Sequence, residues 1–198
     1  MYPPKHHQTQ DKEKMISVIE SYPLAMLVSA KEGKPFITHI PVIYNHDIEK
    51  LVAHIDKHNP QLESLLDGAE VTVVFRGPDV YISPSIYTTP QLPTWNYIIV
   101  HITGTIQWIQ DIEKAKETMI AMTSFLERKE KKYILNPDDK RMEAAIHFIQ
   151  AFEIEITNWE GKFKLSQDKN KQDFEIAKNH LKQNTLKNKE YFIDTIYK

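Results

Sequence analysis

Apolar and polar residues alternate along several stretches of this chain, as they do in half-buried β-strands. The clearest stretch is 96–109, where every second residue from Ile98 to Trp108 is apolar except Gly104. One face of this strand therefore meets a core, and the other a polar or liganded surface. Gly104 indicates a bulge or the close approach of another backbone. Shorter strands are predicted at 24–30, 35–44, 51–55, 69–75 and 152–157.

Capping residues and a helical period predict helices between and around these strands. Asp11 and Asp111 each precede apolar residues spaced three and four apart. Asn136 and Pro137 are typical of a cap followed by proline in the first turn. The predicted helices cover 11–22, a short segment at 60–66, 111–126, 137–149 and a last one from about 171.

The order of these elements predicts the fold class. One helix precedes five or six strands with a short helix among them, and two helices, a strand and a helix follow. Short turns between successive strands favour antiparallel pairing. We therefore expect an α+β fold, a small and mostly antiparallel β-barrel with helices packed outside. Residues 1–184 are predicted to form one domain, and the tail 185–198 to dock on an apolar surface.

Composition and motifs narrow the classes of function. A net charge of -2 over 198 residues argues against a strong, unassisted hold on nucleic acid. The chain has no cysteine, which excludes disulfides, thiolate metal sites and cysteine nucleophiles. It has no apolar run of the length of a membrane span and no signal-peptide pattern, so we expect a cytoplasmic protein. The GxGxxG, GxxxxGK[ST] and GxSxG patterns of nucleotide-binding and hydrolase sites do not occur.

Histidine is the one residue type of metal chemistry that stands out, with nine in the chain. His54 and His58 have the spacing HxxxH, but they flank the end of a predicted strand, where the two rings need not share a face. There is no HExxH and no carboxylate at a persuasive spacing. We therefore predict no metal site.

A proline-rich loop from about 83 to 95 separates two predicted strands. Its hydroxyls and flat rings offer hydrogen bonds beside apolar walls, the mixture that a heteroaromatic ligand uses. The alternative is a covering loop over one end of the barrel. The candidate binding residues in and beside it are Ser83, Trp95 and Asn96.

Two further groups of residues offer donors for an anion. One group lies at the ends of two neighbouring predicted strands, where its side chains could converge on an anion. The alternative is a solvated strand end in which one histidine belongs to the core. The other is the GKFKLSQ segment at 161–167, where the residues alone favour an amphipathic edge strand whose lysines discourage aggregation over an anion site. The candidate residues are Thr38, His39, His54, Lys57 and Asn59 in the first group, and Lys162, Lys164, Ser166 and Gln167 in the second.

Lysines outnumber acidic residues after Gln167. Such a segment is usually a solvated face, although a weak nucleic-acid contact would be sought there. The sequence around Asn136 and Pro137 lacks the glycine turn and basic second helix of a helix-turn-helix. Any DNA contact is therefore expected to be weak or indirect.

Several of these motifs together resemble the PaiB-type FMN-binding negative transcriptional regulators, from Met1 to about Leu181. This resemblance implies a split β-barrel in which two subunits pair and FMN binds at their interface. It also implies repression of sporulation, protease and other degradative-enzyme genes. The motifs are MYPPKH, THIP, HxxKxNP, FRGPDVYISPS, PTWNY, HxxG and GKFKLSQ.

The resemblance assigns roles to the candidate residues. It implies that His54 and Lys57 hold the flavin phosphate, and that Thr38 and His39 face the ring or the ribityl chain. The resemblance also implies that the lysines of GKFKLSQ add positive charge to the flavin site, including the site of a partner subunit. The chain departs from the family pattern at three positions, with His7 in place of Phe, Ile86 in place of Trp and Asp168 in place of Asn.

The function expected from the sequence is thus a dimeric, FMN-binding transcriptional regulator. Two alternatives use the same fold. One is an FMN-dependent oxidoreductase or flavin reductase that uses NAD(P)H, because the cofactor itself supplies the hydride chemistry. The other is a haem-binding split-barrel protein that uses one of the nine histidines.

Overall fold

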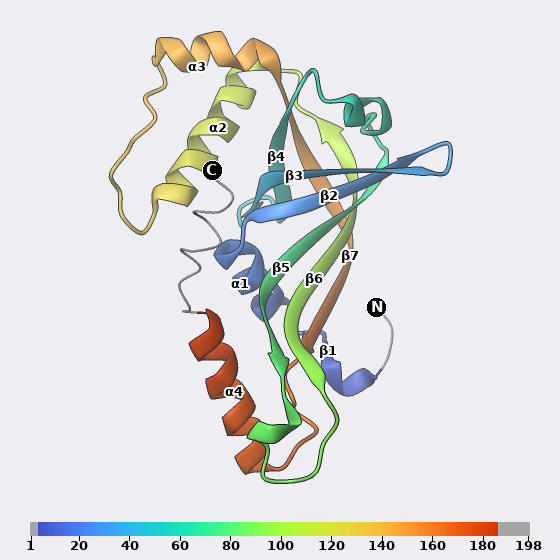
Figure 1. Ribbon diagram of the computed structural model, residues 1–198. Helices are drawn as coiled ribbons and strands as arrows, with labels where there is room; N and C mark the ends of the chain where they lie inside the picture. The colour runs from blue at the N-terminus through green and yellow to red at the C-terminus, as the bar shows by residue number, and fades with distance from the viewer. Residues whose placement is uncertain (1–3, 186–198) are drawn as a thin grey trace, which may run out of the picture. The chain divides into compact units, whose positions relative to one another are not determined.

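The computed structural model describes residues 4–185 and shows an α+β fold (Figure 1). Four short 3₁₀ segments, η1 to η4, lie at Lys5–His7, Pro60–Ser64, Pro84–Ile86 and Ile146–Phe148. The α-helices are α1 (Lys12–Ser21), α2 (Ile112–Glu127), α3 (Lys140–Ala145) and α4 (Lys171–Thr185). The strands are β1 (Gln8–Thr9), β2 (Leu24–Lys31), β3 (Lys34–Asn45), β4 (Lys50–Asp56), β5 (Glu70–Ile82), β6 (Thr94–Trp108) and β7 (Ile149–Lys164).

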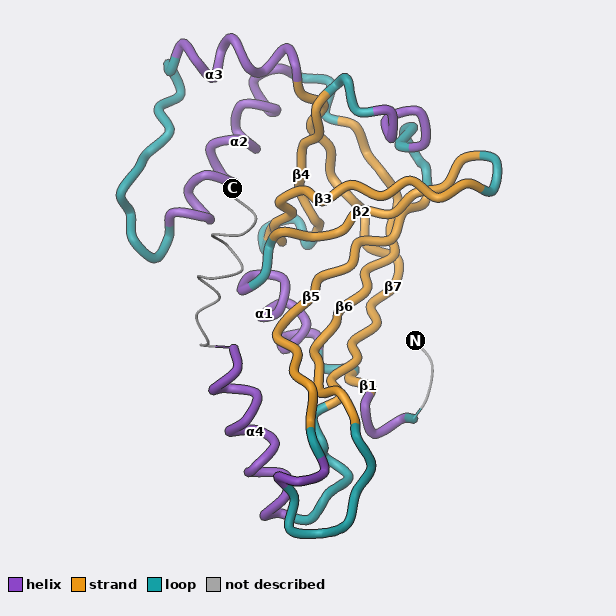
Figure 2. Tube along the Cα trace, viewed as in Figure 1, coloured by secondary structure: helices purple, strands orange, loops and turns teal. Residues whose placement is uncertain are grey.

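The strands form one seven-stranded sheet in the order β1-β7-β4-β3-β2-β5-β6. An additional pairing between β7 and β6 closes the sheet into a ring. Strand β2 pairs antiparallel with β3 and β5, and β4 pairs antiparallel with β3 and β7. Figure 2 shows the long strands β5, β6 and β7 running alongside one another. The predicted α+β, mostly antiparallel barrel with flanking helices is confirmed.

Contacts within the chain group its residues into two units. Within the described residues, unit 1 comprises 4–9, Gly77–Ile98 and 162–185, and unit 2 comprises Gln10–Arg76 and Ile99–Gly161. Strands β5, β6 and β7 each contribute residues to both units. The prediction of one domain over 1–184 stays a prediction, and most of the predicted docked tail lies outside the described residues.

Unit 2 has an apolar core built on the alternation seen in the sequence. Val100, Ile102 and Ile106 of β6 are fully buried, as the period-2 pattern predicts. Helix α2 covers the neighbouring strands, because its Met122 packs against a cluster from β3 and β4. Hydrophobic burial on this scale is the main favourable term in folding.

Gly104 shows why the ring can close. A Cβ atom at this position would lie 2.4 Å from the carbonyl oxygen of Glu155 and 2.6 Å from Cγ2 of Ile154. Glu155 and Ile154 belong to β7, so β6 can approach β7 only where β6 lacks a side chain. The predicted close approach of another backbone is confirmed.

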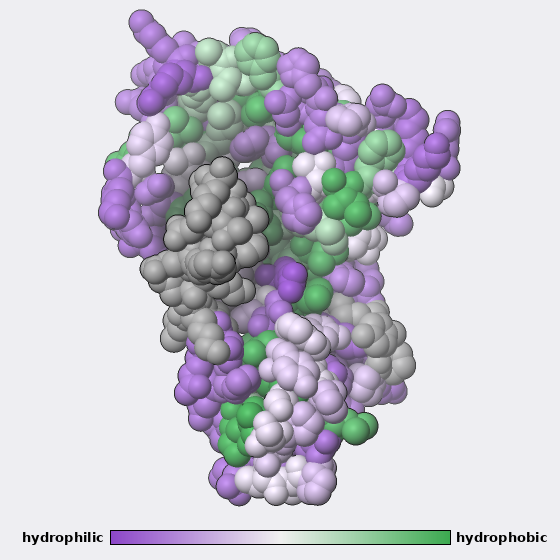
Figure 3. Space-filling view, viewed as in Figure 1, coloured by the Kyte–Doolittle hydropathy of each residue, from purple (hydrophilic) through white to green (hydrophobic). Residues whose placement is uncertain are grey.

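The β2–β3 hairpin is long, pairing from Leu24 with Pro41 to Lys31 with Lys34. Its turn places Glu32 and Gly33 at positive φ, 52° and 75°. The space-filling view shows polar residues gathered over this tip (Figure 3). The hairpin tip is therefore a solvated feature of unit 2.

Helix α3 corrects one predicted boundary. It begins at Lys140, capped by the side chain of Asp139, which accepts a hydrogen bond from the backbone N–H of Arg141. The predicted start at Pro137 is wrong because the Asn136 side chain accepts from the N–H of Asp138 at 3.1 Å and closes a turn instead. Strands β5 and β7 also extend beyond the predicted 69–75 and 152–157.

Unit 1 has a smaller apolar cluster. Ala177 of α4 packs against Val80 and Ile82 at the end of β5, with Ile86 and Leu181 at the margin. Figure 1 shows α4 beside the end of β5. Ile86, the residue that departs from the family pattern, thus contributes to the packing of helix α4.

Candidate functional site

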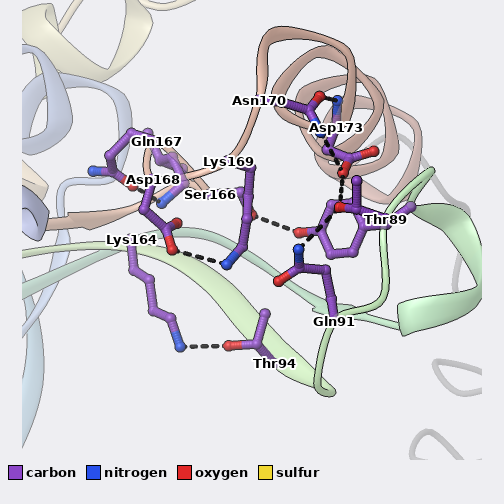
Figure 4. Close-up of polar contacts among 12 residues, drawn as sticks. Thr89, Gln91, Thr94, Lys164, Ser166, Gln167, Asp168, Lys169, Asn170 and Asp173 are labelled. Carbon is purple, nitrogen blue, oxygen red and sulfur yellow. Dashed lines mark hydrogen bonds and ion pairs between the residues drawn. The ribbon is translucent and has the colours of Figure 1, made fainter.

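Unit 1 contains a pocket of about 300 Å³, at the lower end of the size range of small-molecule sites. Its walls come from the end of η1, from the loop that precedes β6 and the first residues of β6, and from the end of β7 with the connection that follows it. Figure 4 shows several of these polar side chains together. The lining residues are His7, Gln91, Leu92, Pro93, Thr94, Asn96, Lys164, Ser166, Asp168 and Lys169.

A buried carboxylate fixes the loop that forms one wall. Asp173, near the start of α4, is fully buried. Its Oδ1 accepts hydrogen bonds from the N–H and the hydroxyl of Thr88 at 2.7 and 2.8 Å. Its Oδ2 accepts from the Thr89 hydroxyl at 2.6 Å and from the Asn170 amide at 2.9 Å (Figure 4). Burial opposes ionisation of this carboxyl, but the hydrogen bonds from Thr89 and Thr88 outweigh burial and lower its pKa to about 2.

Three predicted residues meet in this pocket. The buried hydroxyl of Ser166 donates to Oδ1 of Asn96 at 3.1 Å. It also shares a 2.8 Å hydrogen bond with the hydroxyl of Tyr87. The ammonium group of Lys164 donates to the Thr94 hydroxyl at 2.5 Å. Ser166 has a φ of 60°, an uncommon conformation that its neighbours must hold in place.

The other predicted residues of unit 1 are placed differently. The amide of Gln167 donates to the carbonyl of His6 at 2.9 Å and its oxygen accepts from the N–H of Leu165, so it ties η1 to the end of β7. Ser83 caps the 3₁₀ turn η3 through the N–H of Ser85. Trp95 is about half exposed and meets the ring of Tyr81 edge-on. Lys162 is buried, and neither it nor Ser83, Trp95 or Gln167 lines the pocket.

Several residues of this pocket were not predicted to be binding residues, notably His7, Asp168 and Lys169. Burial lowers the pKa of His7, and the positive charges of His6 and Lys164 add to this effect. Burial raises the pKa of Asp168, but the ion pair with Lys169, at 2.8 Å, outweighs it and the net shift is downward. The only signals in the sequence are the His6–His7 doublet and an acid directly after GKFKLSQ.

The remaining five predicted residues lie in unit 2, where two of the motifs meet. The side-chain amide of Asn59 donates to the hydroxyl of Thr38 at 3.1 Å. The oxygen of the same amide caps η2 by accepting from the N–H of Gln61. THIP and HxxKxNP are therefore joined by a hydrogen bond between β3 and the turn after β4.

His54 and Lys57 follow one another on β4 and the turn after it. Nδ1 of His54 is buried and has no hydrogen-bond partner within residues 4–185. Burial lowers the pKa of His54, so its ring is neutral near pH 7. The ammonium group of Lys57 donates to the carbonyl of His147 at 3.0 Å, and His39 is exposed on β3.

FMN has a phosphate and a ribityl chain that need hydrogen-bond partners and positive charge from the protein. A buried ring nitrogen without a partner is costly unless an incoming group supplies the missing hydrogen bond. A phosphate oxygen or a ribityl hydroxyl can supply that bond, and an ammonium group can neutralise phosphate charge. The residues present in unit 2 therefore fit the polar part of a flavin mononucleotide.

Comparison with known proteins places the chain among flavin-binding proteins. A family model described as "Putative FMN-binding domain" matches residues 1–158. The chain is 30% identical over 179 residues to the protease synthase and sporulation protein PAI 2 of Bacillus subtilis, covering 88% of this chain and 86% of that protein. It is 28% identical over 152 residues to an uncharacterized protein of Saccharomyces cerevisiae, covering 64% of this chain and 88% of that protein. The predicted family and the predicted FMN cofactor are confirmed.

Solved structures share the fold at low sequence identity. A FAD and haem binding protein from Mycobacterium smegmatis superposes with a TM-score of 0.65 at 19% identity, over 86% of this chain and 80% of that one. The flavocytochrome Anf3 from Azotobacter vinelandii superposes with a TM-score of 0.63 at 16% identity, over 88% and 78%. Among the helices of residues 4–185, none combines the length and hydropathy that a membrane-spanning segment requires.

Proposed function

Because this chain belongs to the FMN-binding family matched above, we propose that it is a cytoplasmic, FMN-binding transcriptional regulator. In this proposal two copies pair, FMN binds at their interface, and the dimer represses sporulation and degradative-enzyme genes. Similarity to the sporulation protein PAI 2 supports the regulatory role. The observation that carries FMN binding is the buried Nδ1 of His54, which has no hydrogen-bond partner within the described residues. Lys57 follows three residues later in the chain.

The proposed phosphate contacts are His54 and Lys57. The neutral ring of His54 offers a hydrogen bond, and Lys57 offers a positive charge that pairs with no carboxylate within the described residues. Thr38, His39 and Asn59 are the proposed contacts to the ribityl chain or the ring. The predicted residues of unit 1 form a second group of candidate contacts, which is tested separately.

The cofactor proposal is tested by titrating purified protein with FMN and following the quenching of flavin fluorescence. We expect His54→Gln and Lys57→Met each to weaken FMN binding by more than about tenfold, because each removes one phosphate contact. His46→Gln is the matched control, since His46 is an exposed histidine of unit 2 paired with Glu20. Protein that is colourless as purified and takes up no added FMN would contradict the proposal.

The second group is tested in the same titration. Lys164→Met removes a charged pocket residue while keeping the length of the side chain. Lys178→Met, on the exposed face of α4, is its control. Weaker FMN binding by Lys164→Met alone would assign the pocket of unit 1 to the flavin, and unchanged binding would leave the flavin to the unit 2 residues.

The regulatory proposal needs a DNA measurement. Binding to promoter fragments of sporulation and protease genes should be weak and steeply dependent on salt, because lysines on the surface supply the contacts. Analytical ultracentrifugation of the same samples measures the pairing of two copies. Tight binding that does not respond to salt would contradict this mode of DNA contact, and a monomer at all concentrations would contradict the dimer.

Haem binding is a second candidate because His54 and His101 are both half-buried and burial lowers the pKa of each. A neutral imidazole is the form that binds iron. The flavocytochrome and the FAD and haem binding protein named above have the same fold. A Soret band on haem titration that disappears when one histidine is replaced would favour haem over the flavin alone.

A further inference from the structure

A cluster of metal-binding side chains lies at the edge of the pocket in unit 1. His6, His7 and Asp168 each place one potential ligand atom within 4.8 Å of the other two. The two imidazole rings meet edge to face, with centroids 4.2 Å apart. Two nitrogens and one oxygen form a donor set that zinc-class ions use in proteins.

The surrounding structure holds these three residues together. Gln167 precedes Asp168 and donates to the carbonyl of His6, so η1 and the connection after β7 are tied beside the cluster. Gln167 also accepts from the N–H of Leu165, which orients its amide for that bond. The cluster therefore has support from backbone contacts as well as from its own side chains.

The cluster opens onto the pocket. His7 is only 8% exposed, and both it and Asp168 line the cavity. Three protein ligands leave at least one coordination position of a tetrahedral ion for water or a small ligand. The geometry thus resembles an open site more than a closed structural one.

The charges nearby decide which ions fit. Lys169 pairs with Oδ2 of Asp168, and the ammonium group of Lys164 also lines the pocket. One carboxylate beside two ammonium groups gives little attraction for Mg²⁺ or Ca²⁺, which need several oxygen ligands. An ion that forms strong bonds to imidazole nitrogen gains from His6 and His7 even though the two ammonium groups weaken its binding.

We propose that His6, His7 and Asp168 bind a divalent transition-metal ion of the zinc class, with an open position facing the pocket. Ligand atoms about 2.0–2.2 Å from such an ion lie roughly 3.3 Å from one another. His6 and Asp168 are exposed, so their side chains can close the remaining distance by rotation. One carboxylate oxygen of Asp168 binds the ion. This does not require the other oxygen to leave its ion pair with Lys169.

The test uses full-length protein, stripped with chelator and freed of any affinity tag. Titration with Zn²⁺ is followed by calorimetry, and titration with Co²⁺ by its visible absorption bands, which report nitrogen and oxygen ligands. We expect one ion per chain for each metal and no measurable uptake of Mg²⁺. Absence of Zn²⁺ and Co²⁺ binding up to millimolar concentrations would overturn the proposal.

Variants locate the ion. His6→Ala and Asp168→Asn should each weaken Zn²⁺ binding by more than about tenfold, because each removes one ligand. His147→Ala is the control, since His147 is an exposed histidine of unit 2 whose carbonyl, the acceptor for Lys57, survives the change. Equal affinity in all four proteins would place the ion elsewhere and overturn the assignment.

One variant is expected to strengthen Zn²⁺ binding instead of weakening it. Lys169→Met removes the cation that pairs with Asp168, so Zn²⁺ should bind roughly three- to tenfold more tightly. Merely structural damage to the pocket would weaken binding instead, and that result would count against the proposal. These measurements report the metal directly, so their outcome is independent of whether the protein binds FMN.

Discussion

Each of the two units of this protein is stabilised by a different kind of interaction. Unit 2 is a closed ring of strands with an apolar core, in which β6 alone contributes three fully buried aliphatic residues. Within the described residues, the apolar cluster of unit 1 is a small one around Ala177. Its loops are fixed by polar contacts instead, above all those of Asp173, Ser166 and Gln167.

This difference has a functional reason. A pocket for a polar ligand needs hydrogen-bonding groups on its walls, and such groups cannot be packed like an aliphatic core. Each buried polar group must then be satisfied by a specific partner, which makes the arrangement exact and sensitive to single changes. Unit 2 should therefore be sensitive to changes in its packing and tolerant of changes in its exposed polar contacts, whereas unit 1 should be sensitive to the loss of its buried polar contacts.

The largest expected effect tests the packing of unit 2. Gly104→Val places side-chain atoms where the carbonyl oxygen of Glu155 lies, so β6 and β7 must separate. We expect a loss of about 3 kcal/mol or more in the free energy of unfolding, measured in urea by tryptophan fluorescence. Gly33→Asn is the control because its site is open and Asn tolerates a positive φ. A small effect at Gly104 would mean that the ring does not depend on this contact.

The next effect tests the polar anchoring of unit 1. Asp173→Asn turns one acceptor oxygen into a donor that faces donors from Thr88, Thr89 or Asn170. Hydrogen exchange measured by mass spectrometry should increase in peptides covering 83–93 and stay unchanged over 100–108. Glu175→Gln on the exposed face of the same helix is the control. Faster exchange in both regions alike would erase the distinction between the units.

The same carboxylate predicts a dependence on pH. The folded-state pKa of Asp173 is about 2, below the value of about 3.9 expected in the unfolded chain. Ionised Asp173 therefore stabilises the folded protein above pH 4, and this contribution is lost as the pH falls through the folded-state pKa. The stability difference between the wild type and Asp173→Asn should be constant near neutrality and shrink between about pH 4 and 2 in acid titrations.

The smallest effect concerns a polar contact of unit 2. Lys31 and Glu63 form an exposed ion pair at 2.7 Å near the hairpin tip. Lys31→Ala should change the unfolding free energy by no more than about 0.5 kcal/mol, and less at high salt. A loss comparable to that at Asp173 would show that surface polar contacts matter equally in both units.

Sequence patterns predicted the strands of unit 2 well because the burial of one face of each strand sets its local pattern of apolar and polar residues. The alternation at 96–109 locates β6, observed at Thr94–Trp108, because burial on one face imposes a period of two. The predicted start of α3 at Pro137 was wrong because Asn136 and Asp139 can both cap a helix. The local sequence does not determine which of the two caps the chain uses.

The pocket was only partly predictable because its contacts join distant segments. Lys164, Ser166 and Asn96 were among the predicted residues, and the structure brings them together. No local pattern connects Asp173 with Thr88, or His7 with Asp168, since these pairs meet only once the chain has folded. The roles of the predicted residues in binding FMN stay predictions.

The composition of unit 1 has a consequence for synthesis in the cell. Its described residues come from three separate parts of the chain, including η1 and α4. The hairpins of β2, β3 and β4 can pair soon after they leave the ribosome, because their contacts are local. The backbone carbonyl of His6, by contrast, can accept its hydrogen bond from the side chain of Gln167 only after Gln167 has been translated. The pocket is thus completed late in translation, after the early hairpins have formed.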